Sequence, residues 1–474
     1  MSNIQTRALP VPCGAFAPRR WLALPVILAG TFMVVLDFFI VNVAIPSMQR
    51  ELRAGTAEIE WVVAGYSLAY AALLIPGGRL GDIHGRRFVF ALGLAAFTLA
   101  SAACGLAPNT VALILARAAQ GVGAALLAPQ VLAILGAAYP GADRPRAFAA
   151  YGLVLGLASA CGQLIGGLLI EADVLGLGWR ACFLVNVPVG LLALALTSVT
   201  VPESRAASGR QLDLLGATLV TLGIVGALLP LIEGRAQGWP SWTWLCFAAA
   251  AVLLAAFVVS QRRVAAPLLD AALFQVRRFG IGLLAVLALF GGVASFFLVL
   301  ALYLQQGRGL APLPSGMVFT TMALSFSASS LAAGPIGRCL GRPPLLIGAL
   351  GMALGLGALR VTVGLIGVGG PASLLVPALL IDGAGMGLVM APLVATVLAG
   401  LPDRLGGAAA GVLAAVQQLA NALGVALIGL VFFGALGHDP ERAAYAGAFS
   451  ASLSCLVALA LALAALVWRL ERRV

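Results

Sequence analysis

The sequence predicts an all-α polytopic membrane protein, and its composition, apolar runs and glycine content all point to that class. Of the 474 residues, 62% are hydrophobic and only 9% are charged, whereas soluble globular proteins carry about 25% charged residues. Apolar runs of about 20 residues follow one another, as expected for transmembrane helices. Fifty-eight glycines suit the same class, because small residues let membrane helices approach closely.

Separating the apolar runs at charged or Pro/Gly-rich breaks gives fourteen predicted spans. An even number of spans places both termini on the same side of the membrane. The approximate bounds, in chain order, are 21–46, 60–78, 88–107, 110–138, 147–170, 181–201, 213–233, 242–260, 279–304, 316–336, 344–367, 372–398, 407–433 and 445–468.

The basic residues predict which side of the membrane holds the termini. The net charge is +11, and 20 of the 28 arginines lie in predicted loops on the side of the termini, against six on the opposite side. Basic residues are in excess in cytoplasmic loops, so both termini are predicted to be cytoplasmic. No signal-peptide core precedes the first span. We expect the arginines to meet the lipid bilayer, and we expect no nucleic acid partner.

Two segments form a weak internal repeat, GGRLGDIHGRR at 77–87 and AGPIGRCLGRP at 333–343. At an offset of 256 residues, Gly78, Gly81, Gly85 and Arg86 fall on Gly334, Gly337, Gly341 and Arg342. We therefore expect a six-helix bundle with its N-terminal tail over 1–202, two inserted helices over 203–262 and a second six-helix bundle over 263–474. Duplicated helical halves with a site between them are typical of transporters.

Few ionisable side chains lie within the predicted spans, where burial is costly unless the group is paired or hydrated. At about 1.5 Å per residue, Asp37 lies roughly 24 Å from the side of the termini and Arg117 roughly 10 Å from the opposite side. The two residues are therefore at similar depth, and we expect them to face one cavity. A conformational change that alters the burial or pairing of such a carboxylate loads or releases a proton. A static ion pair between spans 1 and 4 is the alternative.

Asp382 lies near the middle of span 12, within the stretch IDGAGMG. Its small neighbours let another helix or a ligand come close. A buried anion at this depth suits a cationic substrate or a proton, and a hydrogen bond to a neighbouring helix is the alternative. Arg360 of span 11 is expected to extend to the lipid headgroups.

Neutral polar and aromatic residues complete the predicted substrate cavity. Gln417 and Asn421 lie near the middle of span 13, close to Gln418 at helical spacing. Such amides either line a cavity or link helices, and the sequence favours neither. Aromatic rings can stack on flat cations, with lipid contact as the alternative. The predicted cavity residues are Asn42, Gln163, Asp382, Gln417, Asn421, Phe38 and Tyr66.

The sequence contains no motif of an enzyme. GxSxG and the Walker loop are absent, the seven cysteines are scattered singly, and His84 is far from His438. We therefore expect no enzyme activity, no metal site, no cofactor and no disulfide framework.

Several stretches together identify the chain as similar to a known family. They are LDFFIVNVAIP (36–46), GGRLGDIHGRR (77–87), RAAQGVGAA (117–125), WRACFLVNVPVG (179–190), PLLDAALF (267–274) and YLQQGRGLAP (303–312). In these stretches, and nearly end to end, the sequence resembles the fourteen-span drug:proton antiporters of the major facilitator superfamily, of the EmrB/QacA type. The resemblance implies a major facilitator fold, a bacterial inner membrane and a proton-coupling role for Arg117.

The resemblance also implies a conformational gate in the loop between spans 2 and 3. The residues that match the family's loop signature are Gly81, Asp82, Gly85, Arg86 and Arg87. We expect Asp82 to pair with a helix N-terminus or with an arginine across the two halves, and so to latch one conformation.

One stretch departs from the family pattern. CGQLIGG at 161–167 has Gln163 where the family usually has proline. Proline would remove a backbone hydrogen bond and bend the helix, whereas Gln163 restores that bond and adds a polar group. The departure leaves uniport and a substrate contact by Gln163 open.

The function predicted from these observations is proton-coupled efflux of small lipophilic or cationic compounds by alternating access. The alternatives are a dedicated exporter of one endogenous metabolite, antibiotic or amino acid, and a non-transporting membrane sensor. The expected partners are a small-molecule substrate, protons and lipid. Whether a periplasmic adaptor is needed stays open.

Overall fold

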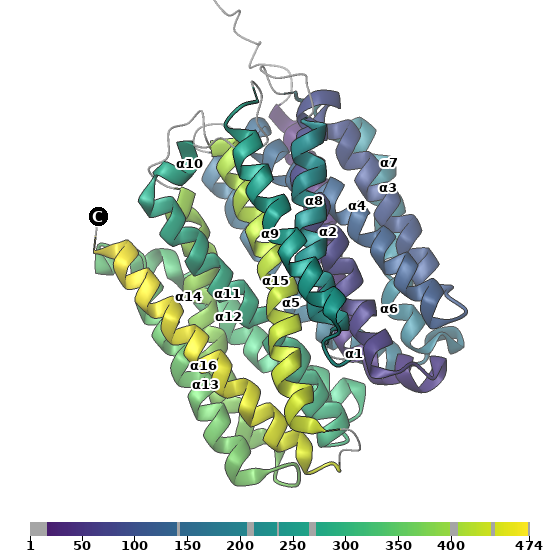
Figure 1. Cartoon of the computed structure of the whole chain (residues 1–474). Helices are drawn as coiled ribbons and strands as arrows, with labels where there is room; N and C mark the ends of the chain where they lie inside the picture. The colour runs from purple at the N-terminus through teal and green to yellow at the C-terminus, as the bar shows by residue number, and fades with distance from the viewer. Residues whose placement is uncertain are drawn as a thin grey trace, which may run out of the picture.

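The structure, a computed structural model, describes residues 17–139, 143–205, 213–234, 237–264, 272–398, 406–437 and 441–472. The secondary structure of this part of the chain is helical throughout (Figure 1). Fourteen of its helices are long and apolar enough to cross a membrane, which confirms the predicted number of spans. Each predicted span overlaps one of them in order.

The helices of the first half are α1 (Ala17–Leu52), α2 (Thr56–His84), α3 (Arg86–Gly105), α4 (Thr110–Ala138), α5 (Asp143–Glu171), α6 (Ala181–Leu184) and α7 (Asn186–Thr200). Two short 3₁₀ turns, η1 (Val174–Gly176) and η2 (Gly178–Arg180), precede α6. Together, η2, α6 and α7 form one span, Gly178–Thr200. We call α1 to α7 the N-terminal bundle, because α1 packs on α5 and α7, while α4 packs on α2 and α3.

The remaining helices are α8 (Leu214–Glu233), α9 (Ser241–Gln261), α10 (Ala272–Gln275), α11 (Arg277–Leu302), α12 (Pro312–Leu340), α13 (Leu345–Ile366), α14 (Val376–Leu398), α15 (Gly406–Leu436) and α16 (Ala444–Glu471). A π-helical turn, η3 (Tyr303–Gly307), extends α11, and a 3₁₀ turn, η4 (Ala372–Leu375), precedes α14. We call α11 to α16 the C-terminal bundle, in which α14 packs on α12 and α13, and α11 packs on α15 and α16.

Several helices are longer than their predicted spans. The helix α1 has 36 residues, or about 54 Å at 1.5 Å per residue, whereas the hydrocarbon core of a bilayer is about 30 Å thick. Apolar runs mark only the lipid-facing part of such a helix. The ends of α1 therefore extend beyond the predicted 21–46.

The two inserted helices pack at the junction of the bundles. The helix α8 packs on α9, on α2 and on α15 (Figure 1). Thr221 of α8 donates to the carbonyl oxygen of Ala72 in α2 over 2.9 Å. The inserted pair thus contacts both bundles along one side.

The bundles meet through α2 with α15 and through α5 with α12. Glycines make the second contact close: a Cβ on Gly167 would lie 2.7 Å from the Pro312 oxygen, and one on Gly316 would lie 2.7 Å from the Gln163 oxygen. Side chains at these two positions would push the helices apart.

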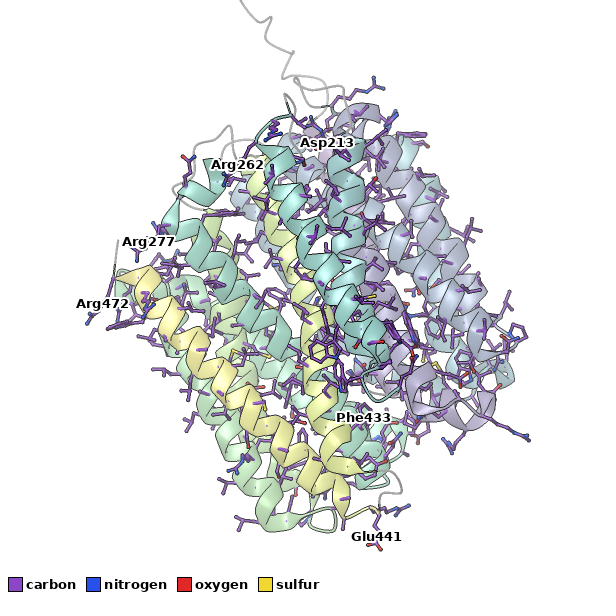
Figure 2. The ribbon with its side chains drawn as sticks, in the orientation of Figure 1. Asp213, Arg262, Arg277, Phe433, Glu441 and Arg472 are labelled. Carbon is purple, nitrogen blue, oxygen red and sulfur yellow. The ribbon has the colours of Figure 1, made fainter. Side chains whose placement is uncertain are left out.

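Charged side chains gather at the two ends of the molecule. Arg262, Arg277 and Arg472 lie toward one end, and Glu441 lies at the other (Figure 2). We call the first the terminal face, because α1 begins and α16 ends there (Figure 1), and the second the far face. Between these faces the helices carry an apolar girdle suited to lipid.

Candidate functional site

Asp37 and Arg117 meet inside the N-terminal bundle. The Arg117 Nη1 atom lies 2.5 Å from the Asp37 Oδ2 atom, and both side chains are at most 1% exposed. Arg117 also donates through Nε to the carbonyl oxygen of Val62 in α2 over 3.0 Å. A charged pair this deeply buried must be satisfied by further hydrogen bonds, because its desolvation cost is large.

Gln120, one turn after Arg117 on α4, makes two of these hydrogen bonds. Its Nε2 donates to the Asp37 Oδ1 over 2.8 Å, and its Oε1 accepts from the Arg117 Nη1 over 2.6 Å. The amide therefore contacts both charges of the pair. Gln120 itself is fully buried.

Asn186 at the start of α7 and Ser101 of α3 complete the network. The Asn186 Nδ2 donates to the Asp37 Oδ1 over 3.2 Å and to the Ser101 Oγ over 3.1 Å. Gln120 donates to the same Ser101 oxygen over 3.0 Å, and Ser101 donates to the carbonyl oxygen of Phe183 over 3.0 Å. Asp37 thus accepts from α4 and α7, so a relative movement of these helices changes its hydrogen bonds.

Two aromatic rings enclose the guanidinium group. Its central carbon lies 4.3 Å from the centroid of the Tyr66 ring and 5.6 Å from that of Phe183. Cation–π attraction is strongest where water is excluded, as it is here. Tyr66, predicted as a cavity residue, therefore lies against Arg117 in this structure.

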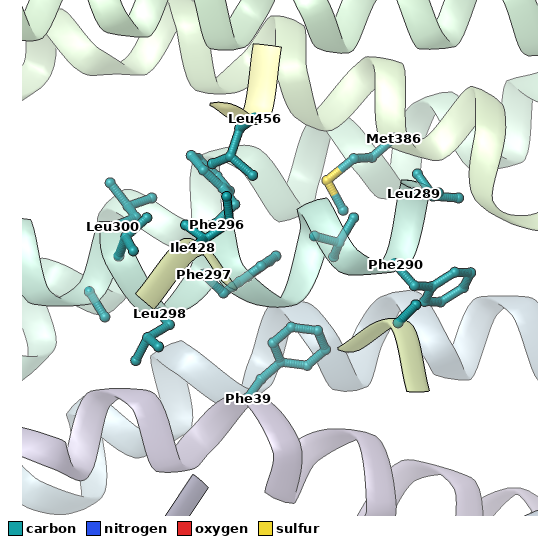
Figure 3. Close-up of a cluster of buried hydrophobic side chains, with 14 of the residues drawn as sticks. Phe39, Leu289, Phe290, Phe296, Phe297, Leu298, Leu300, Met386, Ile428 and Leu456 are labelled. Atoms are coloured by element: carbon teal, nitrogen blue, oxygen red, sulfur yellow. The ribbon is translucent and has the colours of Figure 1, made fainter. Parts of the chain in front are cut away.

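A second site, which we call the junction pocket, is a small pocket between the two bundles. Phe39, Gly156 and Ser159 line it from the N-terminal bundle. The C-terminal bundle contributes Val293, Phe297, Met322, Ala323, Phe326, Met386 and Met390. Phe39 reaches from α1 toward α11 (Figure 3), with its ring centroid 4.6 Å from that of Phe297.

None of the seven predicted cavity residues lines the junction pocket. Phe38 packs edge-on against Phe39, with 5.2 Å between ring centroids, and Asn42 is buried within α1. Asn421 donates to Gln418 over 3.3 Å, while Gln417 is half-buried on the same helix. The lining of the junction pocket is apolar and aromatic, apart from Ser159.

Gln163 links two helices of one bundle. Its Nε2 donates to the carbonyl oxygen of Phe39 over 3.1 Å, while its own Oε1 is buried without a partner. This bond holds α5 against α1. In this conformation Gln163 is fully buried and does not line the junction pocket.

Asp382 lies in another pocket, inside the C-terminal bundle. This small pocket, which we call the α14 pocket, is lined in the described part of the chain by one ionisable residue, Asp382. The two pockets share Val293 and Met386. Asp382 therefore lies next to the junction pocket but does not line it.

The glycine-rich loop at 77–87 folds at the terminal face of the N-terminal bundle. Arg86 donates to Asp82 over 3.1 Å, and the Arg86 backbone N–H donates to the Ser204 oxygen over 2.9 Å. The Arg87 backbone N–H donates to Glu203 over 3.1 Å. In this conformation Asp82 pairs with Arg86 of its own bundle, the first residue of α3. A pairing of Asp82 across the two halves stays a prediction.

Gly81 and Gly85 of the loop lie where a larger residue would collide with a neighbouring side chain. Gly85 has φ +109°, and a Cβ there would lie 2.8 Å from the Glu203 carboxyl group. A Cβ on Gly81 would overlap the amide group of Gln130 on α4. The loop thus fixes the close approach of α2, α3, α4 and the segment after α7.

At the far face the bundles are in contact through polar side chains that were not among the predicted site residues. The Gln306 Nε2 donates to the Gln49 Oε1 over 2.7 Å, and the Tyr445 hydroxyl donates to the Gln306 Oε1 over 2.8 Å. Gln49 belongs to α1 and Gln306 follows α11, so the bond joins the two bundles. The two bundles are therefore in direct contact at this face.

Comparison with known proteins assigns the fold and the relatives. Residues 27–425 match the model of the Major Facilitator Superfamily. The probable actinorhodin transporter of Streptomyces coelicolor is 37% identical over 435 residues, covering 91% of this chain and 75% of that protein. The puromycin resistance protein of Streptomyces alboniger is 39% identical over 441 residues, covering 90% and 85%. A crystal structure of a peptide transporter aligns with TM-score 0.67 over 95% of both chains at 16% identity, which shows a shared fold.

Proposed function

The chain belongs to the Major Facilitator Superfamily, and from this we propose that it exports small lipophilic compounds, cationic ones included, in exchange for protons. The observation that carries the proposal is the buried Asp37–Arg117 pair, whose carboxylate accepts from two further helices. A carboxylate held in this way changes its affinity for a proton when the helices move. The relatives named for actinorhodin transport and for puromycin resistance support export as the direction.

The moving units are the two bundles, with boundaries near residues 202 and 263. The chain is a multi-pass membrane protein, and the excess of arginine on the side of the termini supports a cytoplasmic terminal face. The far face is then the side of the protein that is turned to the outside of the cell. The contact of Gln49 with Gln306 joins the two bundles here, so alternating access requires this contact to break in the outward-open state.

Substrate selection belongs to the junction pocket. Its aromatic and methionine side chains present an apolar, deformable surface, and Ser159 is its polar member. Such a lining suits flat, largely apolar molecules. Because the pocket has residues of both bundles in its wall, a bound molecule contacts both moving units.

The loop at 77–87 serves as the conformational gate in this proposal. Gly81, Asp82, Gly85, Arg86 and Arg87 fix the terminal ends of α2 and α3. A rigid connection at this point lets α2 and α3 move as one body. In this conformation the gate acts within the N-terminal bundle.

A dedicated exporter of one antibiotic is the second candidate function. The relatives named for actinorhodin and puromycin support it. The two candidates differ in the range of compounds carried. Flux measurements with a panel of unrelated aromatic compounds separate them: a multidrug exporter carries many of them, and a dedicated exporter carries one structural class.

Flux in proteoliposomes tests the proposal. Ethidium, a flat aromatic cation, is measured by fluorescence with and without an imposed pH gradient. An antiporter accumulates ethidium only with the gradient, because each proton that moves down the gradient releases about 1.4 kcal/mol per pH unit. Flux that ignores the gradient contradicts antiport and favours uniport, and binding without flux favours a sensor.

A further inference from the structure

The two bundles share a pattern of close glycine contacts that relates their residues one to one. In the N-terminal bundle, a Cβ on Gly123 of α4 would lie 2.5 Å from the Phe97 nitrogen of α3. In the C-terminal bundle, a Cβ on Gly385 of α14 would lie 2.6 Å from the Met352 nitrogen of α13. Gly123 of α4 therefore corresponds to Gly385 of α14, 262 residues further along the chain. Phe97 of α3 corresponds to Met352 of α13, 255 residues further along the chain.

Further glycine contacts give the same offsets. A Cβ on Gly93 would lie 3.0 Å from the Gly123 oxygen, and one on Gly348 would lie 2.7 Å from the Gly385 oxygen. For α1 and α11, the contact of Gly162 with the Leu36 oxygen corresponds to that of Gly424 with the Gly291 oxygen, again at offsets of 262 and 255. The internal repeat therefore extends to the helices that hold Asp37, Ser101 and Arg117.

These offsets place the α14 pocket where the N-terminal bundle has its ion-pair network. The position of Gln120, the amide that binds both charges, is taken by Asp382. The positions of Asp37, Ser101 and Arg117 are taken by Gly292, Leu356 and Leu379. Gly292, Leu356 and Asp382 all line the α14 pocket. The C-terminal copy thus has no arginine and no hydroxyl group at these positions, and its one carboxyl group stands at the position of Gln120 rather than at that of Asp37.

Among the residues that the structure describes, Asp382 has no partner for its charge. It is 2% exposed, and its Oδ1 atom is buried without a hydrogen bond. The rest of the pocket lining is apolar, including Leu289, Phe296, Met386 and Leu456 (Figure 3). An ionised carboxylate in such surroundings is strongly disfavoured, whereas a protonated one is tolerated.

No ionisable group from the packed helices faces Asp382 in the described part of the chain. Arg360 of α13 donates to Ser454 on α16 over 2.8 Å and is exposed, and Cys455 of α16 is exposed. The helices α11 and α12 bring only apolar or hydroxyl side chains to the middle of the bundle. The part of α15 with described side chains adds the neutral amides Gln417, Gln418 and Asn421, which carry no charge. A metal ion would need several oxygen ligands, which the pocket lacks.

We propose that Asp382 in the α14 pocket is a second proton-binding site, pseudo-symmetric to the Asp37–Arg117 network and occupied by a proton in this conformation. The proposal rests on the proposed proton-coupled export. Asp382 takes one proton from water in the conformation in which the pocket is hydrated from one side of the membrane. It returns that proton to water in the conformation in which the pocket is hydrated from the other side. With Asp37, the protein then carries two proton sites per cycle, one in each bundle.

Infrared difference spectroscopy tests this independently of transport. Purified protein in lipid nanodiscs is compared with its Asp382→Asn variant at neutral pH. The wild-type-minus-variant spectrum should contain the C=O stretching band of a protonated carboxylic acid. Two variants serve as controls: Asp382→Glu should keep such a band at a shifted position, and Asp37→Asn should leave the Asp382 band in place. A spectrum with only carboxylate bands would overturn the proposal, even if the protein proves to be a proton-coupled exporter.

Proton counting separates the site from a substrate contact. In proteoliposomes with ethidium as the probe, Asp382→Asn should lower the number of protons exchanged per ethidium by one, with the ethidium KM within about twofold of wild type. An unchanged proton number overturns a coupling role. A KM raised tenfold or more with an unchanged proton number would identify Asp382 as a substrate contact instead. If wild type moves no ethidium with protons, the proposed function fails, while the infrared band still decides whether Asp382 holds a proton.

Discussion

Asn186 of α7 donates its side-chain amide to the Asp37 carboxylate of α1 over 3.2 Å. The bond crosses from the sixth span to the first, between residues 149 positions apart in the chain. It makes the charge state of Asp37 depend on the position of α7 as well as on α4. Asn186 is therefore a positioning residue for the proposed proton site.

Replacing Asn186 by leucine should slow export about tenfold. A hydrogen bond to a charged group contributes roughly 1.5–3 kcal/mol, and about 1.4 kcal/mol in a barrier is a tenfold change in rate. The measurement is pH-driven ethidium flux in proteoliposomes, with the KM for ethidium expected to stay unchanged. Thr197→Val is the matched control, because Thr197 is equally buried on α7 but bonds only the Ala193 oxygen of its own helix. A control that slows flux as much as Asn186→Leu would argue against a specific role.

Breaking the ion pair from one side should destabilise the protein more than removing both charges. Arg117→Gln leaves Asp37 buried without its counter-charge, which costs about 3–5 kcal/mol. The double variant Asp37→Asn with Arg117→Gln should recover much of that loss, as measured by unfolding in detergent.

Transport by the same double variant separates structure from coupling. We expect it to fold and to move no ethidium against a gradient. If it exports at the wild-type rate, the pair is a static link between α1 and α4, and proton coupling lies elsewhere.

More of the fold than of the candidate site could be predicted from the sequence. Apolar runs and the arginine bias predict the spans, because each helix must by itself be apolar enough to lie in the bilayer. Asp37 and Arg117 stood out because charge is rare in spans. Gln120, Ser101 and Asn186 carried no such signal: neutral polar residues recur in membrane helices, and only the rotation of each helix decides which of them meet. The stretches that contain Gln120 and Asn186 were recognised, but the contacts of these two residues with Asp37 were not.

The junction pocket was missed for a related reason. Phe297, Met322 and Met386 resemble any lipid-facing residue in sequence, and their place in the pocket depends on how the two bundles dock. The internal repeat was predicted from a loop, but its most informative part lies in α14, where one carboxyl group replaces an amide. Detecting that replacement required the glycine contacts, which fix the register of the two copies.

Adding a methyl group to Gly316 should open the far face. Its Cβ would lie 2.7 Å from a backbone oxygen of α5, which cannot move without the helix. We expect Gly316→Ala to raise several-fold the labelling of a Gln305→Cys thiol by a membrane-impermeant reagent, in a background without the exposed Cys339 and Cys455. Gln305 is buried beside Gln306, and its replacement leaves the Gln49–Gln306 bond intact. Gly334→Ala on the same helix meets nothing within 4 Å and should leave labelling unchanged. Equal labelling in both variants would mean that the α5–α12 contact does not hold the far face closed.

The repeat also offers a matched pair for the gate. Gly85 and Gly341 both have positive φ, +109° and +66°. A Cβ at Gly85 would meet Glu203, whereas one at Gly341 would meet nothing within 4 Å. Both alanine variants carry backbone strain of about 1–3 kcal/mol, so Gly85→Ala should lose more unfolding free energy than Gly341→Ala, and it alone should slow ethidium flux. Equal losses would mean that the Gly85–Glu203 contact is not structurally required.

Substrate-driven proton movement tests the central claim most directly. Proteoliposomes that enclose a pH-sensitive dye receive ethidium outside, with no initial pH gradient. The account predicts that the lumen becomes more alkaline in wild type, as protons leave in exchange for ethidium, and that Asp37→Asn lowers the change by half or more. Ethidium uptake without any pH change in wild type, or an unaltered pH change in Asp37→Asn, would contradict it.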